Sequence, residues 1–202
     1  ANATTGKTIW KYQSTADYVD DFGFDDGPRA VPTISTGRVY TLGANGLIKC
    51  NDAITGKVLW KVDVRKQFEA GKGFFGLACS PLVSGRNVLI NIGGQSAGII
   101  ALDTQTGKIR WKATEGKSSY ASPILTKIND QPHAIFFTRE GIVSAEPSTG
   151  KVMFSHNWRP SMHASVNACT PVAVGNLIFV STSYGKGAIV LAVDGKKIKT
   201  VW

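Results

Sequence analysis

The stretch Ile99–Lys112, IIALDTQTGKIRWK, contains the pattern on which the rest of the chain is built. An apolar run ends at Asp103, a polar turn containing Gly107 follows, and a second β-prone run carries Trp111. An Asp before such a turn can accept hydrogen bonds from nearby backbone amides, and glycine accepts the positive φ that tight turns need. The stretch therefore predicts two antiparallel strands joined by a short turn.

Copies of this pattern recur at intervals of 43 to 51 residues along the whole chain. A polar residue precedes an aromatic ring by eight positions in five pairs: Asn2 and Trp10, Asp52 and Trp60, Asp103 and Trp111, Glu146 and Phe154, and Asp194 and Trp202. Four copies have a glycine and a lysine in the turn, and these glycines are Gly6, Gly56, Gly107 and Gly150. A repeat of this length made of strands and turns is typical of a propeller blade, in which the rings fill the space between neighbouring sheets.

Each repeat opens with a proline, which is tolerated at the start of a strand because no ladder donor is needed there. The runs that follow are rich in β-prone residues and predict second strands over Arg38–Leu42, Asn87–Ile92, Ala134–Thr138 and Leu177–Ser181. We therefore expect an all-β protein, a single β-propeller segment over 1–202 with four-stranded antiparallel blades. The blades are expected at 28–62, 77–113, 120–156 and 167–202, with a partial blade at 1–12, as part of a larger ring of seven or eight blades.

The composition excludes several classes of function. The formal net charge is +9, but the lysines follow the turn glycines or lie on the last strands, where lysine protects solvated edges from pairing. This scattered charge argues against nucleic acid as a partner. No apolar run reaches the roughly 18 residues of a membrane span, and no signal peptide is recognisable. Since the chain begins inside a repeat, we interpret it as a fragment or a processed product.

The three cysteines are far apart and show neither a disulfide framework nor metal-ligand spacing. Cys50 occupies the position that Ala101 and Ser144 hold in other repeats. We therefore predict that Cys50 is a small buried residue.

The spacing of Asp, Gly and Trp, with TGK in the turn and a proline opening each unit, resembles the PQQ-type (pyrroloquinoline quinone) β-propeller repeat. The similarity covers essentially the whole chain. This repeat occurs in quinoprotein alcohol dehydrogenases, usually as eight blades, and in non-catalytic relatives such as the lipoprotein that assists outer-membrane β-barrel assembly. The resemblance implies a location in the periplasm or elsewhere outside the cytoplasm, within the bacterial cell envelope.

Catalytic members of this family hold the quinone beside a disulfide between adjacent cysteines, with a calcium or lanthanide ion and a catalytic aspartate. This sequence has no adjacent cysteines. We therefore expect no catalytic residue and no cofactor, and a role as a protein- or ligand-binding scaffold. The alternative is part of a PQQ-dependent alcohol dehydrogenase, with PQQ and Ca²⁺, whose cofactor-binding residues lie outside this stretch.

Loops at one face of a propeller commonly form its binding surface. Residues shortly before the strand-opening prolines should lie near the mouth of the central channel if the first strand of each blade is innermost. Arg29, Tyr120 and Asn167 meet this condition. Together with His163, on the same loop as Asn167, they are the four candidate contacts for a ligand or a protein partner. Each of them also fits a structural role, since buried polar groups mostly satisfy the local backbone.

The first inter-blade loop, 13–29, is rich in aspartate. Carboxylate oxygens are the ligands that Ca²⁺ prefers, so the candidate metal ligands are Asp20, Asp21, Asp25 and Asp26. The spacing is not that of an EF-hand, and a solvated or partner-facing acidic loop is the other interpretation.

The second inter-blade loop, 65–78, contains Phe74 and Phe75, which we predict to anchor this loop on the propeller face, with a partner hot spot as the alternative. Its glycines lack the strand-to-helix context of a nucleotide site. His133 is expected in a turn and His156 on a terminal strand, without a nucleophile-elbow motif. The outer blades lack a neighbour, so self-association through their open faces is a further expectation.

Overall fold

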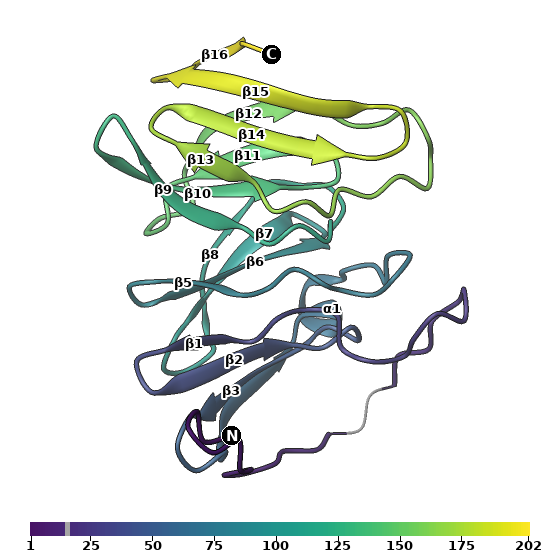
Figure 1. Ribbon diagram of the computed structural model, residues 1–202, viewed down its shortest axis with the longest axis vertical. Helices are drawn as coiled ribbons and strands as arrows, with labels where there is room; N and C mark the ends of the chain where they lie inside the picture. The colour runs from purple at the N-terminus through teal and green to yellow at the C-terminus, as the bar shows by residue number, and fades with distance from the viewer. Residues whose placement is uncertain (15–16) are drawn as a thin grey trace.

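The computed structural model describes residues 1–14 and 17–202. Four antiparallel sheets of four strands follow one another along the chain, and in each sheet the strands pair in chain order. Figure 1 shows the sheets stacked along the long axis, from the N-terminal sheet at the bottom to the C-terminal sheet at the top. The predicted all-β fold with four-stranded antiparallel blades is confirmed.

The strand bounds are as follows. The first blade contains β1 (Thr33–Ser35), β2 (Arg38–Leu42), β3 (Leu47–Asp52) and β4 (Val58–Asp63). The second contains β5 (Leu82–Ser84), β6 (Asn87–Gly94), β7 (Ala97–Asp103) and β8 (Ile109–Ala113). The third contains β9 (Ile124–Ile128), β10 (Gln131–Phe137), β11 (Gly141–Ala145) and β12 (Val152–Asn157). The fourth contains β13 (Val172–Val174), β14 (Leu177–Thr182), β15 (Gly187–Asp194) and β16 (Lys197–Thr200).

The first strand of every blade begins directly after its proline, and β2 has the predicted bounds. β10 begins earlier than predicted, because Asn129 and Asp130 both adopt positive φ and form a tight turn before it. The prediction that His133 lies in a turn was therefore wrong, since His133 is buried on β10. The short helix α1 (Val64–Phe68) was not predicted, and Asp63 caps it by accepting a hydrogen bond from Lys66 N at 3.0 Å.

The N-terminal copy of the repeat forms its turn, in which Gly6 N donates to Asn2 O at 2.8 Å. Among the residues described before Thr33, however, no strand is formed. The predicted partial blade at 1–12 is therefore present as a turn and a docked Trp10 ring, without strand pairing.

The repeated rings lie between neighbouring blades, as the sequence predicts. Trp60 lies against Gly107 of the next blade, where an added Cβ would come within 2.7 Å of the ring. The Trp60 Nε1 donates to Thr104 O of the same turn at 3.0 Å. Equivalent bonds join Trp10 to Ala53 O and Trp111 to Pro147 O. Each of these three rings therefore binds the turn of the blade that follows it in the chain.

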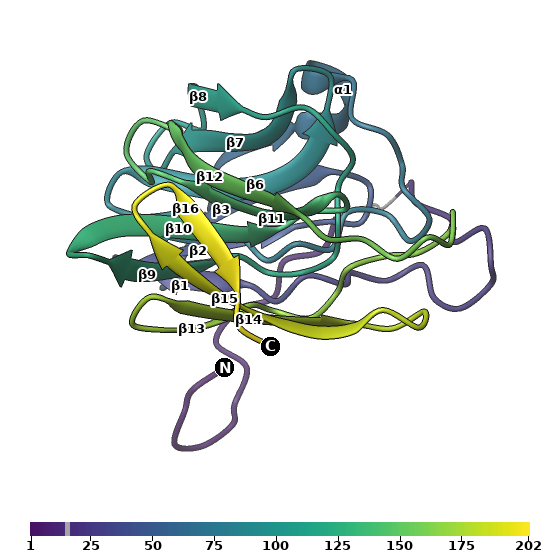
Figure 2. The ribbon, with the colours of Figure 1, turned by 90° about the horizontal axis from the view of Figure 1, so that it is seen from above.

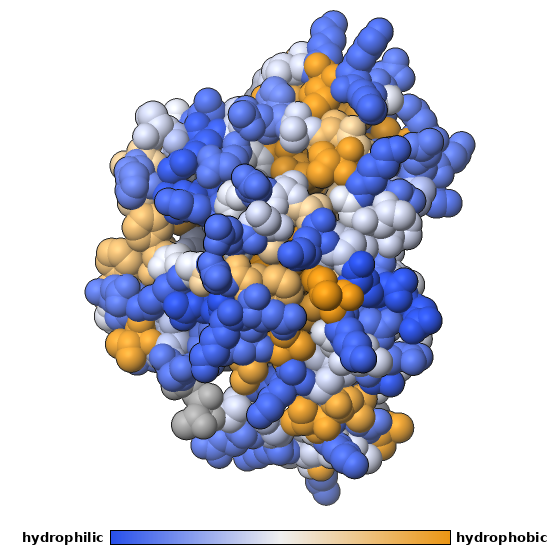
Figure 3. All heavy atoms as spheres, turned by 180° about the vertical axis from the view of Figure 1, so that it is seen from behind, coloured by the Kyte–Doolittle hydropathy of each residue, from blue (hydrophilic) through white to orange (hydrophobic). Residues whose placement is uncertain are grey.

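The last two rings differ from the others. Phe154 is buried among apolar residues of the third and fourth blades, although the turn of the fourth blade is shortened and carries no close ring contact at Gly195. Trp202 is 71% exposed, and no further turn follows it in the described chain. Figure 3 shows hydrophobic side chains at the surface of this upper, C-terminal end of the molecule.

The core consists of three apolar clusters, one in each space between successive blades. Cys50 lies in the first cluster and is fully buried, which confirms the prediction for this residue. The segments that open the first three blades lie side by side: Val31 N donates to Ser80 Oγ at 3.0 Å, and Ser80 N donates to Ser122 Oγ at 3.3 Å. Figures 1 and 2 both show the long inter-blade loops extending on one side of the molecule, at the right.

Candidate binding face at the inter-blade loops

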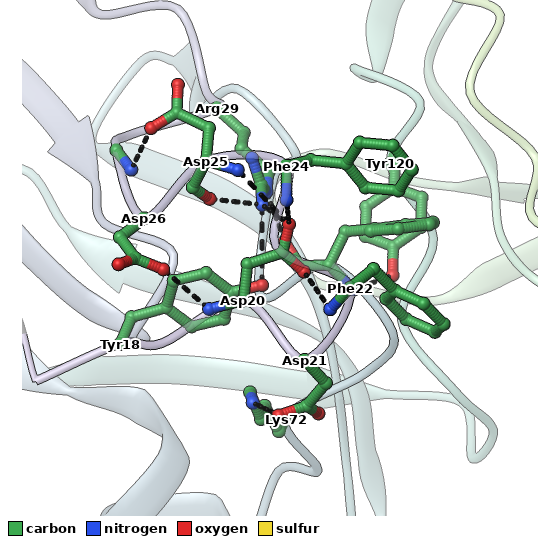
Figure 4. A network of polar contacts seen from close by, with 12 residues as sticks. Tyr18, Asp20, Asp21, Phe22, Phe24, Asp25, Asp26, Arg29, Lys72 and Tyr120 are labelled. Carbon is green, nitrogen blue, oxygen red and sulfur yellow. Dashed lines mark hydrogen bonds and ion pairs between the residues drawn. The ribbon is translucent and has the colours of Figure 1, made fainter.

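The first inter-blade loop is organised around the buried carboxylate of Asp20 (Figure 4). This carboxylate accepts hydrogen bonds from the backbone N–H groups of Phe22, Phe24 and Asp25 at 2.9–3.2 Å. It also forms an ion pair with Arg29 at 3.3 Å. Burial by itself would raise the pKa of Asp20, but these hydrogen bonds and the Arg29 charge outweigh it and lower the pKa. The loop is thus closed around one charged centre.

The other three candidate calcium ligands have separate partners. Asp21 pairs with Lys72 at 2.5 Å, Asp25 accepts from Gly27 N, and Asp26 accepts from Asp20 N, both at 2.7 Å. The carboxylates therefore do not converge on one point in Figure 4. Within the described ranges, no group of three or more His, Cys, Asp or Glu side chains is arranged to hold a metal ion.

The peptide unit of Phe75 connects the first three loops. Arg29 Nε donates to Phe75 O at 2.6 Å, and Phe75 N donates to the Tyr120 hydroxyl at 2.9 Å. Burial raises the pKa of Tyr120, so its hydroxyl stays neutral and serves here as an acceptor. Two of the candidate contacts are thereby fixed on either side of the second loop.

Asn167 joins the fourth loop to this network. Its backbone oxygen accepts from Tyr120 N at 3.0 Å, and its Nδ2 donates to Thr138 O at 2.8 Å. His163 is exposed at the edge of the network, with its ring 6.3 Å from that of Phe74 in an edge-on orientation. The structure therefore brings Arg29, Tyr120 and Asn167 into one hydrogen-bonded unit, with His163 beside it.

Four phenylalanine rings from the first two loops form a cluster that we call the aromatic ridge: Phe22, Phe24, Phe74 and Phe75. The Phe22 ring is 5.2 Å from that of Phe75 and 6.4 Å from those of Phe24 and Phe74, measured between centroids. Phe22 is 54% exposed and Phe24 is 76% exposed. The hydrogen bonds to Asp20 thus fix the backbone of Phe22 and Phe24 while their hydrophobic side chains stay exposed to solvent.

Sequence reasoning missed two residues of this face. Asn91 is buried on β6, and its Oδ1 accepts from Ser119 N at 2.8 Å, which fixes the third loop. An Asn within the apolar run NVLINI is a signal that could have revealed it. Arg139 is also buried, at the turn between β10 and β11, where a sequence gives little reason to expect a buried charge.

A cleft of about 340 Å³ opens between these loops and is lined by Phe74, Lys117, Ser118, Tyr120, Arg139, His163 and three glycines. A larger cavity of about 550 Å³ lies between the N-terminal segment and the first blade, lined by residues such as Trp10, Tyr12, Val39, Leu47 and Lys49. This second cavity occupies the inter-blade space where Trp10 docks, so its shape follows from the packing of the segment that precedes β1.

The structure offers little support for chemistry at histidine or cysteine. His133 Nδ1 lies 2.7 Å from Ser144 Oγ inside the third blade, and burial lowers the pKa of this histidine. All three cysteines are free, and burial raises the pKa of Cys79 to about 12. Since no two cysteines are adjacent in the sequence, the chain does not supply the disulfide expected beside a bound quinone. We therefore derive no quinone chemistry from these residues.

Among the described residues, no helix is long and apolar enough to cross a bilayer.

Known proteins share both the sequence pattern and the fold. The dehydrogenase subunit of the quinone alcohol dehydrogenase from Komagataeibacter europaeus is 30% identical over 118 residues, which cover 55% of this chain and 16% of that subunit. The structure of BamB from Moraxella catarrhalis has a TM-score of 0.56 at 20% identity, over 85% of this chain and 46% of that one. The quinohemoprotein alcohol dehydrogenase ADHIIG from Pseudomonas putida HK5 gives 0.64 at 17% identity, over 88% and 34%.

The chain thus spans less than half of the length of each of these relatives. The likeness to the two solved structures supports the propeller fold. A family model described as the outer membrane protein assembly factor BamB matches residues 1–202. The predicted PQQ-like repeat is therefore confirmed, and the chain belongs to the family of the outer membrane protein assembly factor BamB.

Proposed function

We propose that this chain is a non-catalytic propeller segment that binds another protein of the bacterial cell envelope through the aromatic ridge. The observation that carries this proposal is the exposure of Phe22 and Phe24 on a loop whose backbone is fixed by Asp20. Exposed clusters of large apolar side chains are uncommon on monomeric proteins and mark interaction sites. Aromatic anchors also supply most of the binding energy in many protein interfaces.

The rigidity of the loop face supports the same function. Arg29, Phe75 and Tyr120 are joined by hydrogen bonds between segments 45 and 46 residues apart in the sequence. A surface that is already ordered loses little conformational entropy on binding, so more of the contact energy appears as affinity. The family description as an outer membrane protein assembly factor agrees with a protein partner. We accordingly propose a periplasmic or otherwise extracytoplasmic location.

Site-specific photo-crosslinking in the bacterium that carries the gene tests this function. A photoreactive phenylalanine analogue at position 24 should give crosslinks to a defined envelope protein. The control position is Ile54, which is 78% exposed at the opposite end of the first blade, and it should not give this product. A Phe22→Asp change should abolish the crosslink from position 24, because it places a charge in the apolar contact. Identical products from positions 24 and 54 would contradict the proposal.

The alternative function is a part of a quinone-dependent alcohol dehydrogenase, favoured by the 30% sequence identity to such a dehydrogenase subunit over 118 residues. The protein is incubated with PQQ and Ca²⁺ and passed through a gel-filtration column. We expect no quinone absorbance in the protein peak and no dye-linked oxidation of alcohols. Stoichiometric retention of the quinone would favour the dehydrogenase and overturn the non-catalytic proposal.

A further inference from the structure

Arg139 is a buried cation for which no acidic partner is provided. Its residue is only 6% exposed, and it takes part in none of the ion pairs formed by the described residues. One guanidinium nitrogen, Nη2, donates to His163 O, while Nε has no hydrogen-bond partner in the described part of the chain. Removing a charge from water without pairing it costs free energy, so the position of Arg139 calls for an explanation.

The surroundings of Arg139 add positive charge. Arg159 donates to the same His163 oxygen at 3.2 Å, and its other terminal nitrogen pairs with Glu140 at 3.5 Å. Burial, and to a smaller extent the Arg159 charge, lower the pKa of Arg139, although the nearby Glu140 charge acts in the opposite direction. Glu140 forms its ion pair with Arg159 and offsets the charge of Arg139 only in part.

Arg139 lines the cleft of about 340 Å³ between the loops. Lys117 lies on the rim, Ser118 offers a hydroxyl, and none of the described lining residues is acidic. Phe74 and Tyr120 supply flat apolar surface, and the Arg139 guanidinium lies 5.1 Å from the centroid of the Phe74 ring. The cleft therefore combines two cations, hydrogen-bond donors and aromatic walls.

A glycine keeps this cleft open. A Cβ at Gly73 would lie 3.3 Å from the Tyr120 hydroxyl, so a side chain there would crowd the aromatic wall. Gly71 and Gly93 also line the cleft, and neither contributes a side chain to it. The space beside Arg139 therefore depends on the glycines at these three positions.

We propose that this cleft binds a small organic anion, a carboxylate carried by a planar apolar body about the size of one or two rings. The carboxylate would be held by Arg139, with Lys117 at the rim, and the planar body would lie against Phe74 and Tyr120. Arginine suits this role because its planar group donates paired hydrogen bonds to carboxylates. A volume of this size is within the range of small-ligand sites. The site shares Phe74 with the aromatic ridge but goes beyond the proposed protein-binding function, which is carried by the exposed Phe22 and Phe24.

Isothermal titration calorimetry with benzoate tests the charge and the shape of the ligand. We expect benzoate to bind with a Kd of about 1 mM or tighter, because charge-assisted hydrogen bonds are added to ring burial. Benzamide, which has the same shape without the charge, and acetate, which lacks the ring, should each bind about tenfold more weakly. Inorganic phosphate should not compete with benzoate at equal concentration. If benzamide binds as well as benzoate, or if no heat of binding appears, the proposal is overturned.

Two variants test the residues. Arg139→Gln should weaken benzoate binding by about tenfold or more, because a charge-assisted hydrogen bond is lost. The exposed Lys117→Ala should weaken it about threefold while leaving the melting temperature unchanged, so the test holds even if Arg139→Gln folds poorly. Arg86→Gln is the matched control, since the Arg86 side chain is 66% exposed and pairs with Asp103 at the opposite end of the blade. Benzoate binding that is unaltered by both cleft variants would refute the site.

The two proposals can fail separately. Phe22→Asp should abolish the crosslink from position 24 but leave benzoate binding intact. Lys117→Ala should leave this crosslink intact and weaken benzoate binding about threefold.

Discussion

The Trp60 side chain connects two blades through both its ring face and its N–H group. Gly107 lies under the ring with φ of +70°, and the indole Nε1 bonds to Thr104 O. Ring and turn therefore constrain each other: the ring needs a residue without a side chain, and the turn needs a positive φ. Phe154, which has no N–H to donate, stands in the one repeat whose following turn is shortened. The ring type thus matches the turn that it faces.

Replacing Gly107 by Ala should lower the free energy of unfolding by about 2–4 kcal/mol, because a Cβ would overlap the Trp60 ring and because φ is positive. Chemical denaturation measures the change. The control is Gly85→Ala, where φ is +55° but no atom lies within 4 Å of the added Cβ. That variant should lose only about 1 kcal/mol from backbone strain. Equal losses in the two variants would mean that the ring contact contributes nothing.

His133 should make the stability depend on pH. Burial keeps its pKa below the ordinary value of 6.5, so the unfolded chain takes up the proton at a higher pH than the native protein. As the pH falls below about 6.5, the unfolded state gains protons and the native state loses stability.

The melting temperature of the wild type should therefore fall between about pH 7.5 and pH 5, and that of His133→Gln should fall less. Differential scanning calorimetry at several pH values provides the comparison. His156→Gln, on β12 of the same blade, serves as the control and should follow the wild type. A His133→Gln variant with an unchanged pH slope would show that another group is responsible.

At the scale of the elements, the strands follow from local sequence, whereas the loops do not. The periodic turns and the β-prone runs predicted the order of the strands, because hairpin pairing joins residues that are close in sequence. The first loop instead depends on partners such as Phe75 O, which lies 46 residues from Arg29. A contact of that range has no local signature, and for this reason Arg139 and the cleft could not be predicted.

The helix α1 and the early start of β10 illustrate the same limit over short distances. α1 is a single turn capped by Asp63, too short to produce a helical period in the sequence. β10 begins earlier than predicted because Asn129 and Asp130 adopt positive φ and form the turn before it. Asn and Asp tolerate positive φ, but their presence in a sequence does not require a turn at that position. The places of Arg29, Tyr120 and Asn167 before the prolines predict that they lie near one another, and the structure joins them by hydrogen bonds through Phe75. Their role in binding a ligand or partner stays a prediction.

Replacing Asp20 by Ala should loosen the first loop. Three backbone N–H groups and Arg29 would lose their acceptor, so the hydrogen bonds that fix this loop would be lost together. Hydrogen exchange should accelerate at the amides of Phe22, Phe24 and Asp25. Asp21→Ala is the control, because its ion pair with Lys72 is exposed and such pairs contribute little. Unaltered exchange in Asp20→Ala would contradict the central role of this carboxylate.

At the scale of the whole molecule, the outer face of the fourth blade presents apolar surface. Leu177 is exposed by 41% on β14, and Trp202 projects at the same end. In the inner blades the corresponding rings are covered by the next blade. An uncovered blade face tends to associate, since stacked repeats gain stability from their neighbours.

We therefore expect a polypeptide of residues 1–202 to self-associate as its concentration rises from about 1 to 100 µM, as weak apolar contacts do. Trp202→Ser should shift the equilibrium toward the monomer. Sedimentation velocity measures both proteins. Leu125→Ser, at a similarly exposed apolar residue on β9, is the control and should behave as the wild type. A protein that stays monomeric throughout this range would exclude association through the open face.

The tryptophan rings dock onto turns that lie later in the chain. The order in which the ribosome synthesises the blades therefore affects when each ring becomes buried. Trp60 cannot be covered until the segment around Thr104, 44 residues further on, has emerged. A nascent chain that has completed only the first or the second blade therefore carries an exposed indole, Trp60 or Trp111, until the next hairpin emerges and covers it. During synthesis from the N-terminus, each of these indoles is thus buried only when the following blade has been made.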